Sequence, residues 1–201
     1  HKYDTNYGLS ESTGPGCVHL GMENIHKVGA IGIPGYRWEV KVVDEQGNAV
    51  PQGEVGELCV KGPGVMTCYY NNPEATAEVL KNGWLYTGDM AMQDADGFYF
   101  LVDRKKDVVV SGGENIYPKE IEEFIYTHPA VKDVQVIGVP DKKYGEEAMA
   151  CIILKEPGSV TVEEMLDYIK ASMARHKVPK YIDFVDAFPM NAAGKILKYK
   201  M

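Results

Sequence analysis

The sequence predicts an α+β protein: a small antiparallel β subdomain with a distorted barrel-like shape, followed by a compact α+β unit. Three observations predict this. Strand patterns and turn residues fill the chain to about residue 102, and two long amphipathic helical patterns occur only after residue 107. Between them lies an uninterrupted run of charges, Asp103–Asp107. We therefore expect two domains, residues 1–103 and 104–201, with a hinge near residues 104–107.

The first half alternates strand patterns with turn residues. YRWEVKVVD (residues 36–44) and ELCVKG (57–62) predict strands, and the residues between them have turn composition. NPEATAEVLKN (72–82) predicts a short helix that is capped by Asn72. MAMQDADGFYFLV (90–102) predicts a hairpin around an Asp–Gly turn. This turn begins like a calcium loop, but Tyr99 and Lys105 replace the required Gly and Glu.

The second half mixes helices with strands. PKEIEEFIYTH (118–128) begins with proline and carries acidic residues in its first turns, which predicts a helix start. VKDVQVIGV (131–139) and EAMACIILK (147–155) predict two strands around the turn PDKKYGE. TVEEMLDYIKASMARH (161–176) opens with a capping box, and KYIDFV (180–185) predicts a last strand.

The composition excludes several classes of protein. A hydrophobic fraction of 45% and a charged fraction of 25% are typical of a globular protein. The net charge of −8 and the lack of a basic stripe argue against nucleic-acid binding, and no apolar run reaches the roughly 20 residues of a transmembrane segment. Four scattered cysteines indicate reduced thiols in a cytoplasmic protein, and scattered histidines argue against a transition-metal site. The chain begins with neither Met nor a signal peptide, so we expect a fragment.

Two motifs in the first half place polar groups at turns. In YGLSE (7–11), the Ser10 hydroxyl could contact a phosphate and the Glu11 carboxylate could hold Mg²⁺. An ordinary strand-end turn is the alternative; a hydrolase elbow is disfavoured because Ser12 stands where its last glycine is required. In GWLYTGD (83–89), Asp89 could accept both hydroxyls of a ribose, with Arg104 as a second contact. The alternative for Asp89 is a solvated turn residue. The alternative for Arg104 is membership of a surface charge cluster, to which Lys105 is assigned.

Two further motifs lie in the second half. SGGEN (111–115) provides a Gly–Gly pair that permits close approach of another molecule, although a plain strand-to-helix loop explains it equally well. NAAGKILKYK (191–200) presents Lys195 on a loop of small residues. Such a lysine is usually just solvated, but beside a reacting phosphate it would stabilise developing negative charge.

Taken together, these stretches resemble the adenylate-forming superfamily, which includes acyl- and aryl-CoA synthetases, the adenylation domains of peptide synthetases, and luciferases. The resemblance spans essentially the whole chain. It is carried by five motifs in the family's order, and the fourth looks most like acyl-CoA synthetases: YGLSE, GEVGELCVKGPGVMTCYYNNPEAT, GWLYTGD, DRKKDVVVSGGENIYPKEIE and PMNAAGKI.

The resemblance implies a two-step ligase reaction with ATP, Mg²⁺ and coenzyme A. A carboxylic acid and ATP give acyl-AMP and pyrophosphate, and the thiol of CoA then displaces AMP. It also implies that residues 1–103 are the C-terminal portion of a large AMP-binding domain and that residues 104–201 are a C-terminal lid domain. The lid alternates between two poses.

The resemblance also implies a role for each motif. Ser10 would contact phosphate, Glu11 would hold Mg²⁺, and Tyr7 with Gly8 would line the junction of the adenine and acyl sites. Four further roles follow for six residues: Asp89 and Arg104 would hold the ribose, Lys106 would be the hinge, Gly112 and Gly113 would border the pantetheine channel, and Lys195 would serve the adenylation step.

The sequence departs from the family at three points. Ser10 replaces the usual Thr but keeps the hydroxyl; Tyr144 replaces an Arg that some relatives direct at CoA, for which Lys177 and Lys180 are possible substitutes. The Ser/Thr/Gly-rich phosphate loop and most of the acyl pocket are absent. We therefore expect a fragment that is inactive alone and needs the N-terminal portion of its own chain.

Two other hypotheses remain open at this stage. The acyl group could pass to a carrier-protein pantetheine rather than to free CoA, or the fold could be a non-catalytic nucleotide-binding module. Retention of Glu11, Asp89, Arg104 and Lys195 together weighs against the module. Neither the acid nor the oligomeric state follows from the sequence, and a homo-oligomer is compatible with it.

Overall fold

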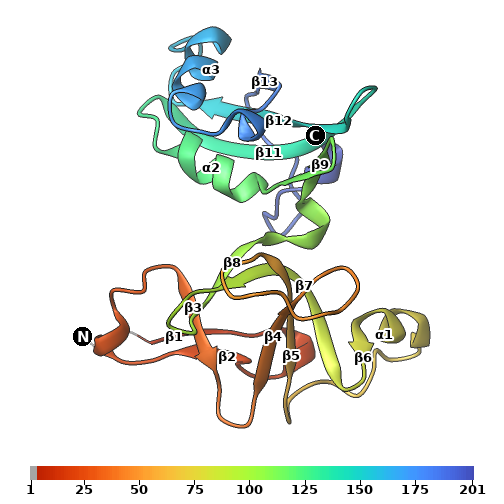
Figure 1. Cartoon of the computed structure of the whole chain (residues 1–201). Helices are drawn as coiled ribbons and strands as arrows, with labels where there is room; N and C mark the ends of the chain where they lie inside the picture. Colours follow the sequence, from red (N-terminus) through yellow and green to blue (C-terminus); the bar gives the residue numbers. More distant parts are fainter. Residues whose placement is uncertain (1–3) are drawn as a thin grey trace. The chain divides into compact units, whose positions relative to one another are not determined.

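A computed structural model describes residues 4–201 (Figure 1). These residues form two compact units: the first ends at Lys105, and the second begins at Lys106. Within the described residues there are three α-helices, and antiparallel pairing dominates both sheets. The α+β class predicted from the sequence is therefore confirmed. The two units are described separately below.

The first unit is a single sheet in the strand order β1-β2-β3-β8-β7-β5-β4, with β6 paired to β7. All of its pairings are antiparallel. Its strands are β1 (Thr5–Tyr7), β2 (Cys17–His19), β3 (Ala30–Pro34), β4 (Glu39–Val43), β5 (Gly56–Lys61), β6 (Leu80–Lys81), β7 (Trp84–Gln93) and β8 (Tyr99–Arg104).

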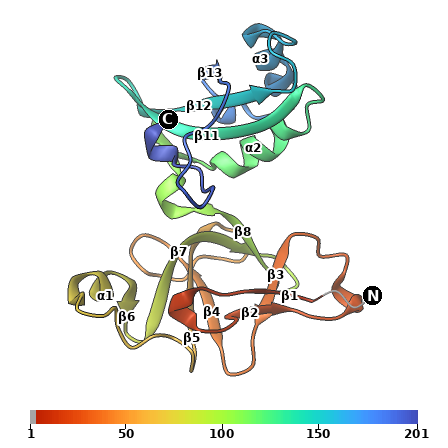
Figure 2. The same cartoon turned by 180° about the vertical axis from the view of Figure 1, so that it is seen from behind.

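The expected barrel-like shape needs correction, because this sheet is open. The end strands β1 and β4 are only three and five residues long, and no ladder joins them in the described part of the chain. Its core includes Leu58, Tyr99 and Val42, which pack in one cluster with Tyr7. Figure 2 shows these strands from behind.

Helix α1 (Pro73–Val79) follows β5 and has the predicted cap. The side chain of Asn72 accepts a hydrogen bond from the backbone N–H of Ala75 at 3.1 Å, and Pro73 occupies the first turn. This helix precedes β6 and the long strand β7, on which Asp89 lies.

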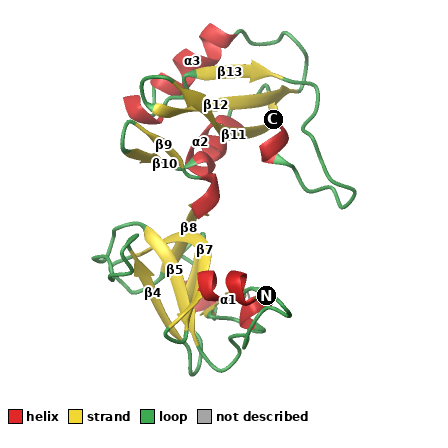
Figure 3. Ribbon diagram, turned by 90° about the vertical axis from the view of Figure 1, so that its right-hand side faces the viewer, coloured by secondary structure: helices red, strands yellow, loops and turns green. Residues whose placement is uncertain are grey.

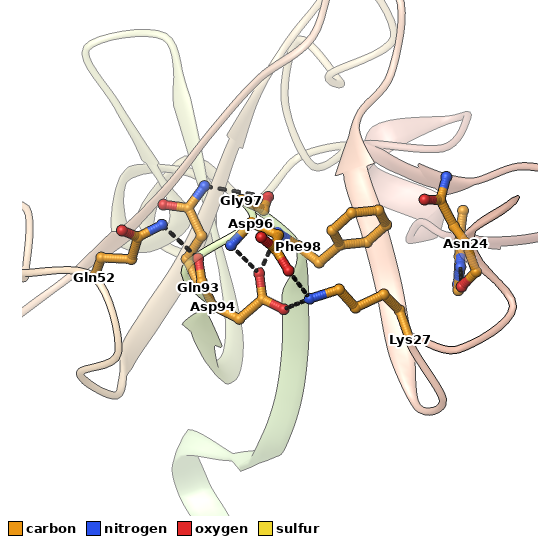
Figure 4. A network of polar contacts seen from close by, with 9 residues as sticks. Asn24, Lys27, Gln52, Gln93, Asp94, Asp96, Gly97 and Phe98 are labelled. Carbon is orange, nitrogen blue, oxygen red and sulfur yellow. Dashed lines mark hydrogen bonds and ion pairs between the residues drawn. The ribbon is translucent and has the colours of Figure 1, made fainter.

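A polar network fixes the turn between β7 and β8, which is a hairpin turn as predicted (Figure 4). The carboxylate of Asp94 accepts backbone N–H groups from Asp96 at 3.0 Å and Phe98 at 2.9 Å. The ammonium of Lys27 pairs with Asp94 at 2.6 Å and also with Asp96. The lysine thus bridges the two carboxylates of this turn.

The second unit is a five-stranded sheet in the order β10-β9-β12-β11, with β13 paired in parallel to β12. Helices α2 and α3 accompany this sheet and are labelled in Figure 3. Its elements are β9 (Val109–Ser111), β10 (Glu114–Ile116), α2 (Pro118–Tyr126), β11 (Val131–Asp141), β12 (Gly145–Leu154), α3 (Val162–Lys170) and β13 (Tyr181–Phe184).

The two faces of this sheet are covered by different segments. Both helices contribute to a cluster with alternate strand residues such as Val136 and Ala150. The intervening strand residues, Ile137 and Cys151, face the other side and pack with Phe188 of the C-terminal segment. The alternation of side chains along β11 and β12 thus gives this unit a core on each face.

Candidate functional site

Tyr7, Asp89 and Arg104 come together in the first unit. The hydroxyl of Tyr7, at the end of β1, donates to Oδ2 of Asp89 at 2.6 Å. Asp89 on β7 lies directly opposite Arg104 on β8 in the antiparallel ladder. Residues in such positions have Cβ atoms about 4.5–5.5 Å apart, so the carboxylate and the guanidinium arise from one small area. The sheet therefore places an acidic and a basic residue opposite each other on adjacent strands.

Tyr7 is suited to hold Asp89 in one orientation. Its side chain is buried, and this burial, together with the hydrogen bond to Asp89, raises the pKa of the phenol well above its usual range. The phenol therefore stays protonated and donates to the carboxylate at every pH of interest.

The expected Thr–Gly turn before Asp89 lies instead inside β7, where the pairing with β5 shifts register, and contacts with Leu58 and Glu57 of β5 fix this stretch. The hydroxyl of Thr87 donates to the carbonyl of Leu58 at 2.7 Å and accepts the N–H of Asp89 at 3.2 Å. Gly88, at a φ of +72°, donates its N–H to Glu57 at 3.1 Å. Long-range contacts of this kind leave no spacing pattern in a sequence.

Ser10 and Glu11 lie on a short 3₁₀ helix, η1 (Ser10–Ser12), just after β1. The buried hydroxyl of Ser12 fixes this turn, because it accepts the N–H of Leu9 at 2.8 Å. Ser10 is exposed and Glu11 is half-buried. Gly8 is required by close packing, since an added Cβ would lie 2.6 Å from the carbonyl oxygen of Gly14.

Lys105 is exposed, as expected of a surface charge, and it also makes an ion pair. Its ammonium lies 2.7 Å from Oε2 of Glu57, a carboxylate that is 7% exposed. The two compact units meet in the sequence immediately after this residue. Lys106 itself is exposed on the short 3₁₀ helix η3 (Lys105–Asp107).

Gly112 and Gly113 form a hairpin turn between β9 and β10, not the expected strand-to-helix loop. Their φ angles of +59° and +90° explain the need for glycine. The N–H of Gly112 donates to the carbonyl of Tyr144 at 3.0 Å, and a Cβ there would lie 3.0 Å from the Tyr144 ring. Tyr144 therefore supports the glycine turn from the β11–β12 turn.

Lys195 stands on a fixed turn near the end of the second unit. The side-chain oxygen of Asn191 accepts the N–H of Ala193 at 3.0 Å and that of Lys195 at 2.9 Å. The ammonium of Lys195 is carried by an exposed side chain. Lys177 and Lys180 instead make ion pairs, with Glu120 at 2.6 Å and with Asp141.

The described residues include four free cysteines and no cluster of three or more His, Cys, Asp or Glu side chains that could hold a metal. Burial raises the pKa of Cys17 and of Cys59 to about 12, so neither thiol is an activated nucleophile. In the same part of the chain, no helix is long and apolar enough to cross a membrane.

Comparison with known proteins gives two matches to protein families. The AMP-binding enzyme family matches residues 5–70, and the AMP-binding enzyme C-terminal domain matches residues 120–195. The first match contains Tyr7, Ser10 and Glu11, and the second ends at Lys195.

Individual relatives are similar over nearly the whole chain. Feruloyl-CoA synthase from Amycolatopsis sp. is 42% identical over 193 residues, which cover 96% of this chain and 39% of the relative. A long-chain-fatty-acid–CoA ligase from Escherichia coli is 42% identical and covers 97% of this chain and 34% of the relative. The chain thus spans less than half the length of the curated relatives that it matches.

A solved structure agrees with this pattern. o-Succinylbenzoate CoA synthetase from Bacillus subtilis, in complex with its acyl-adenylate intermediate, superimposes with a TM-score of 0.89 at 36% identity. The match covers 98% of this chain and 40% of that one. The same synthetase has also been solved with ATP and a magnesium ion.

Proposed function

Because the chain belongs to the family of AMP-binding enzymes, we propose that it is the C-terminal part of an AMP-forming acyl-CoA synthetase. The observation that supports this most is the grouping of Tyr7, Asp89 and Arg104, which offers a held carboxylate and a guanidinium to a ribose. The similarity to an acyl-adenylate complex agrees with such a ligand.

The proposed reaction has two steps. First, a carboxylate oxygen of the acid attacks the α-phosphorus of ATP, the bond to the bridging oxygen breaks, and pyrophosphate leaves. Second, the thiolate of CoA attacks the carbonyl carbon of the acyl-AMP, and AMP leaves with the electron pair. The acid, ATP and CoA are therefore the small-molecule partners, and the N-terminal portion of the same polypeptide supplies the acyl pocket.

The first unit would hold the nucleotide. Asp89 and Arg104 would bind the ribose, and the exposed hydroxyl of Ser10 would contact a phosphate oxygen. Tyr7 would line the adenine and acyl junction while it orients Asp89. Gly8 would form the neighbouring wall, where the close approach of Gly14 leaves no room for a side chain.

Glu11 fits a magnesium ion that arrives with the nucleotide. Mg²⁺ is usually held by one or two carboxylates together with substrate phosphates and waters, so a single half-buried carboxylate suffices. When bound, the ion would neutralise charge on the phosphates.

The second unit would serve both steps by changing its pose at Lys106. Lys195 would present its ammonium where negative charge develops during adenylation. The Gly112–Gly113 turn would border the narrow channel for the pantetheine arm of CoA, with Tyr144 behind it. We further propose a cytoplasmic enzyme, in agreement with its four free cysteines.

The test separates the two half-reactions in the full-length enzyme. Lys195→Ala should lower ATP–pyrophosphate exchange with a cognate acid by about 100-fold or more, because it removes a charge that acts on the first transition state. Thioester formation from ready-made acyl-AMP should stay within about threefold of wild type, a difference of less than 1 kcal/mol.

Lys200→Ala is the matched control, since this exposed lysine lies five positions further along the same tail. It should leave both half-reactions unchanged. Equal loss of both half-reactions in Lys195→Ala would contradict the proposed division of labour. The loaded enzyme is then offered either CoA or a phosphopantetheinyl carrier protein. The thiol that causes release of AMP is the acceptor.

A further inference from the structure

Tyr69 makes an unexpected contact with Glu11. Its hydroxyl donates to Oε1 of Glu11 at 2.9 Å, across a separation of 58 residues in the sequence. Tyr69 belongs to the loop between β5 and α1, whereas Glu11 belongs to η1 after β1. The contact therefore joins two segments that only the folded sheet brings together.

The backbone of Tyr69 is fixed at the start of α1. Its N–H donates to Oγ1 of Thr76 at 2.9 Å, and its carbonyl accepts the N–H of Asn72 at 3.3 Å. Asn72 is also the N-cap of the helix. The backbone of Tyr69 is thus held at the start of α1, and from there its phenol reaches Glu11.

The same loop also holds the backbone of Glu11. The N–H of Met66 donates to the carbonyl of Glu11 at 2.7 Å. Gly64 packs so closely that an added Cβ would lie 2.4 Å from the carbonyl oxygen of Ser12. Main chain and side chain of Glu11 are therefore both positioned by residues 64–69.

The donor to Glu11 is neutral, and this matters for its charge. In the described part of the chain, none of the ion pairs involves Glu11. A lysine or arginine partner would cancel the negative charge that a cation needs, whereas a phenol orients the carboxylate and leaves its charge in place.

We propose that Tyr69 is a positioning residue that orients the carboxylate of Glu11 toward the magnesium ion of the bound nucleotide. The proposal rests on the function proposed above for Glu11. Partners that orient a metal ligand typically change metal affinity by about 10- to 100-fold when they are removed. Tyr69 should therefore act on the magnesium dependence of adenylation more than on its maximal rate.

The experiment measures two quantities for the full-length enzyme: Mg²⁺ binding in the presence of a non-hydrolysable ATP analogue, by calorimetry, which Tyr69→Phe should weaken, and ATP–pyrophosphate exchange as a function of free Mg²⁺ at fixed ATP. Tyr69→Phe should raise the Mg²⁺ concentration for half-maximal exchange by about tenfold, with the rate at saturating Mg²⁺ within about threefold of wild type. Tyr70→Phe is the matched control, because the adjacent Tyr70 is 92% exposed. It should match wild type at every Mg²⁺ concentration.

A second pair of variants tests the anchor without altering the phenol. Thr76→Val removes the acceptor for the N–H of Tyr69 and should shift the Mg²⁺ dependence in the same direction, whereas Thr76→Ser keeps the oxygen and should not. A wild-type Mg²⁺ dependence in both Tyr69→Phe and Thr76→Val would overturn the inference. If wild-type enzyme shows no exchange at any Mg²⁺ concentration, the proposed function itself fails.

Discussion

At the scale of single residues, Asp141 shows how one carboxylate organises the turn between β11 and β12. It accepts the N–H groups of Lys143 at 2.8 Å and Tyr144 at 2.9 Å, and it pairs with the ammonium of Lys180. The carbonyl of Tyr144 in turn accepts the N–H of Gly112. Asp141 thereby supports the glycine turn through a single intermediate residue.

These contacts predict a pH dependence of stability. The hydrogen bond from Lys180, followed by the two backbone donors, lowers the pKa of Asp141 to about 2, against about 3.9 in an unfolded chain. A lowered pKa in the folded state means that the contribution is complete above about pH 4 and is lost as the pH falls toward 2. The urea midpoint of the second unit should fall over this range.

Asp141→Asn removes the titrating group, so its urea midpoint should fall less steeply between pH 4 and pH 2 than that of wild type. Asp167→Asn is the control, because the side chain of Asp167 is 80% exposed. It should keep the wild-type slope. Parallel slopes for wild type and Asp141→Asn would show that the Lys180 pairing does not shift the pKa of Asp141.

Sequence reasoning identified several residues of the candidate site but not the residues that contact them. Tyr7, Asp89 and Arg104 were selected from separate motifs, and the strand register then places Asp89 opposite Arg104. The contacts of Glu57 with Lys105 and of Tyr69 with Glu11 span 48 and 58 residues. No local pattern encodes such distances, because the chain's path through the sheet decides which side chains meet.

At the scale of elements, long periodic patterns were predicted well and short strands were not. The three helices begin where their start signals placed them, but α1 ends at Val79 and α3 at Lys170, earlier than their patterns predicted. The hairpin of β9 and β10 was missed, because each strand has only three residues and neither shows an alternation of apolar and polar side chains. Two strands of that length are recognisable only from their pairing.

Helix α3 offers a test of capping. Oγ1 of Thr161 accepts the N–H of Glu164 at 3.2 Å, and the Glu164 carboxylate accepts the N–H of Thr161 at 2.9 Å. The cap holds a helix whose Met165 and Ile169 are fully buried in the core. Thr161→Ala should lower the free energy of unfolding of the second unit by about 1 kcal/mol, measured by urea denaturation.

Ser159→Ala is the control for this helix, since Ser159 is exposed and precedes the capping box. It should change stability by less than about 0.5 kcal/mol. Equal stability of Thr161→Ala and wild type would mean that packing of the buried face alone determines the position at which α3 begins.

At the scale of the whole molecule, each compact unit contains its own core. One hydrophobic cluster belongs to the first unit, and two belong to the second, on opposite faces of its sheet. The second unit therefore covers both faces of its sheet with residues from Lys106 onward. A domain that changes pose during turnover needs such independence, because its core must survive every pose.

The last prediction follows from this independence. A fragment of residues 106–201, about 100 residues long, is within the range of domains that fold alone. It should unfold cooperatively on heating and protect the amides of β11 and β12 from exchange. A fragment of residues 106–185 loses Phe188 and the rest of the C-terminal cover, so Ile137 and Cys151 become exposed. It should be destabilised by several kcal/mol, since burial of one large apolar side chain contributes about 1.5–3 kcal/mol. An unfolded 106–201 fragment, or equal stability of the two fragments, would contradict an autonomous unit and the pivoting role proposed for Lys106.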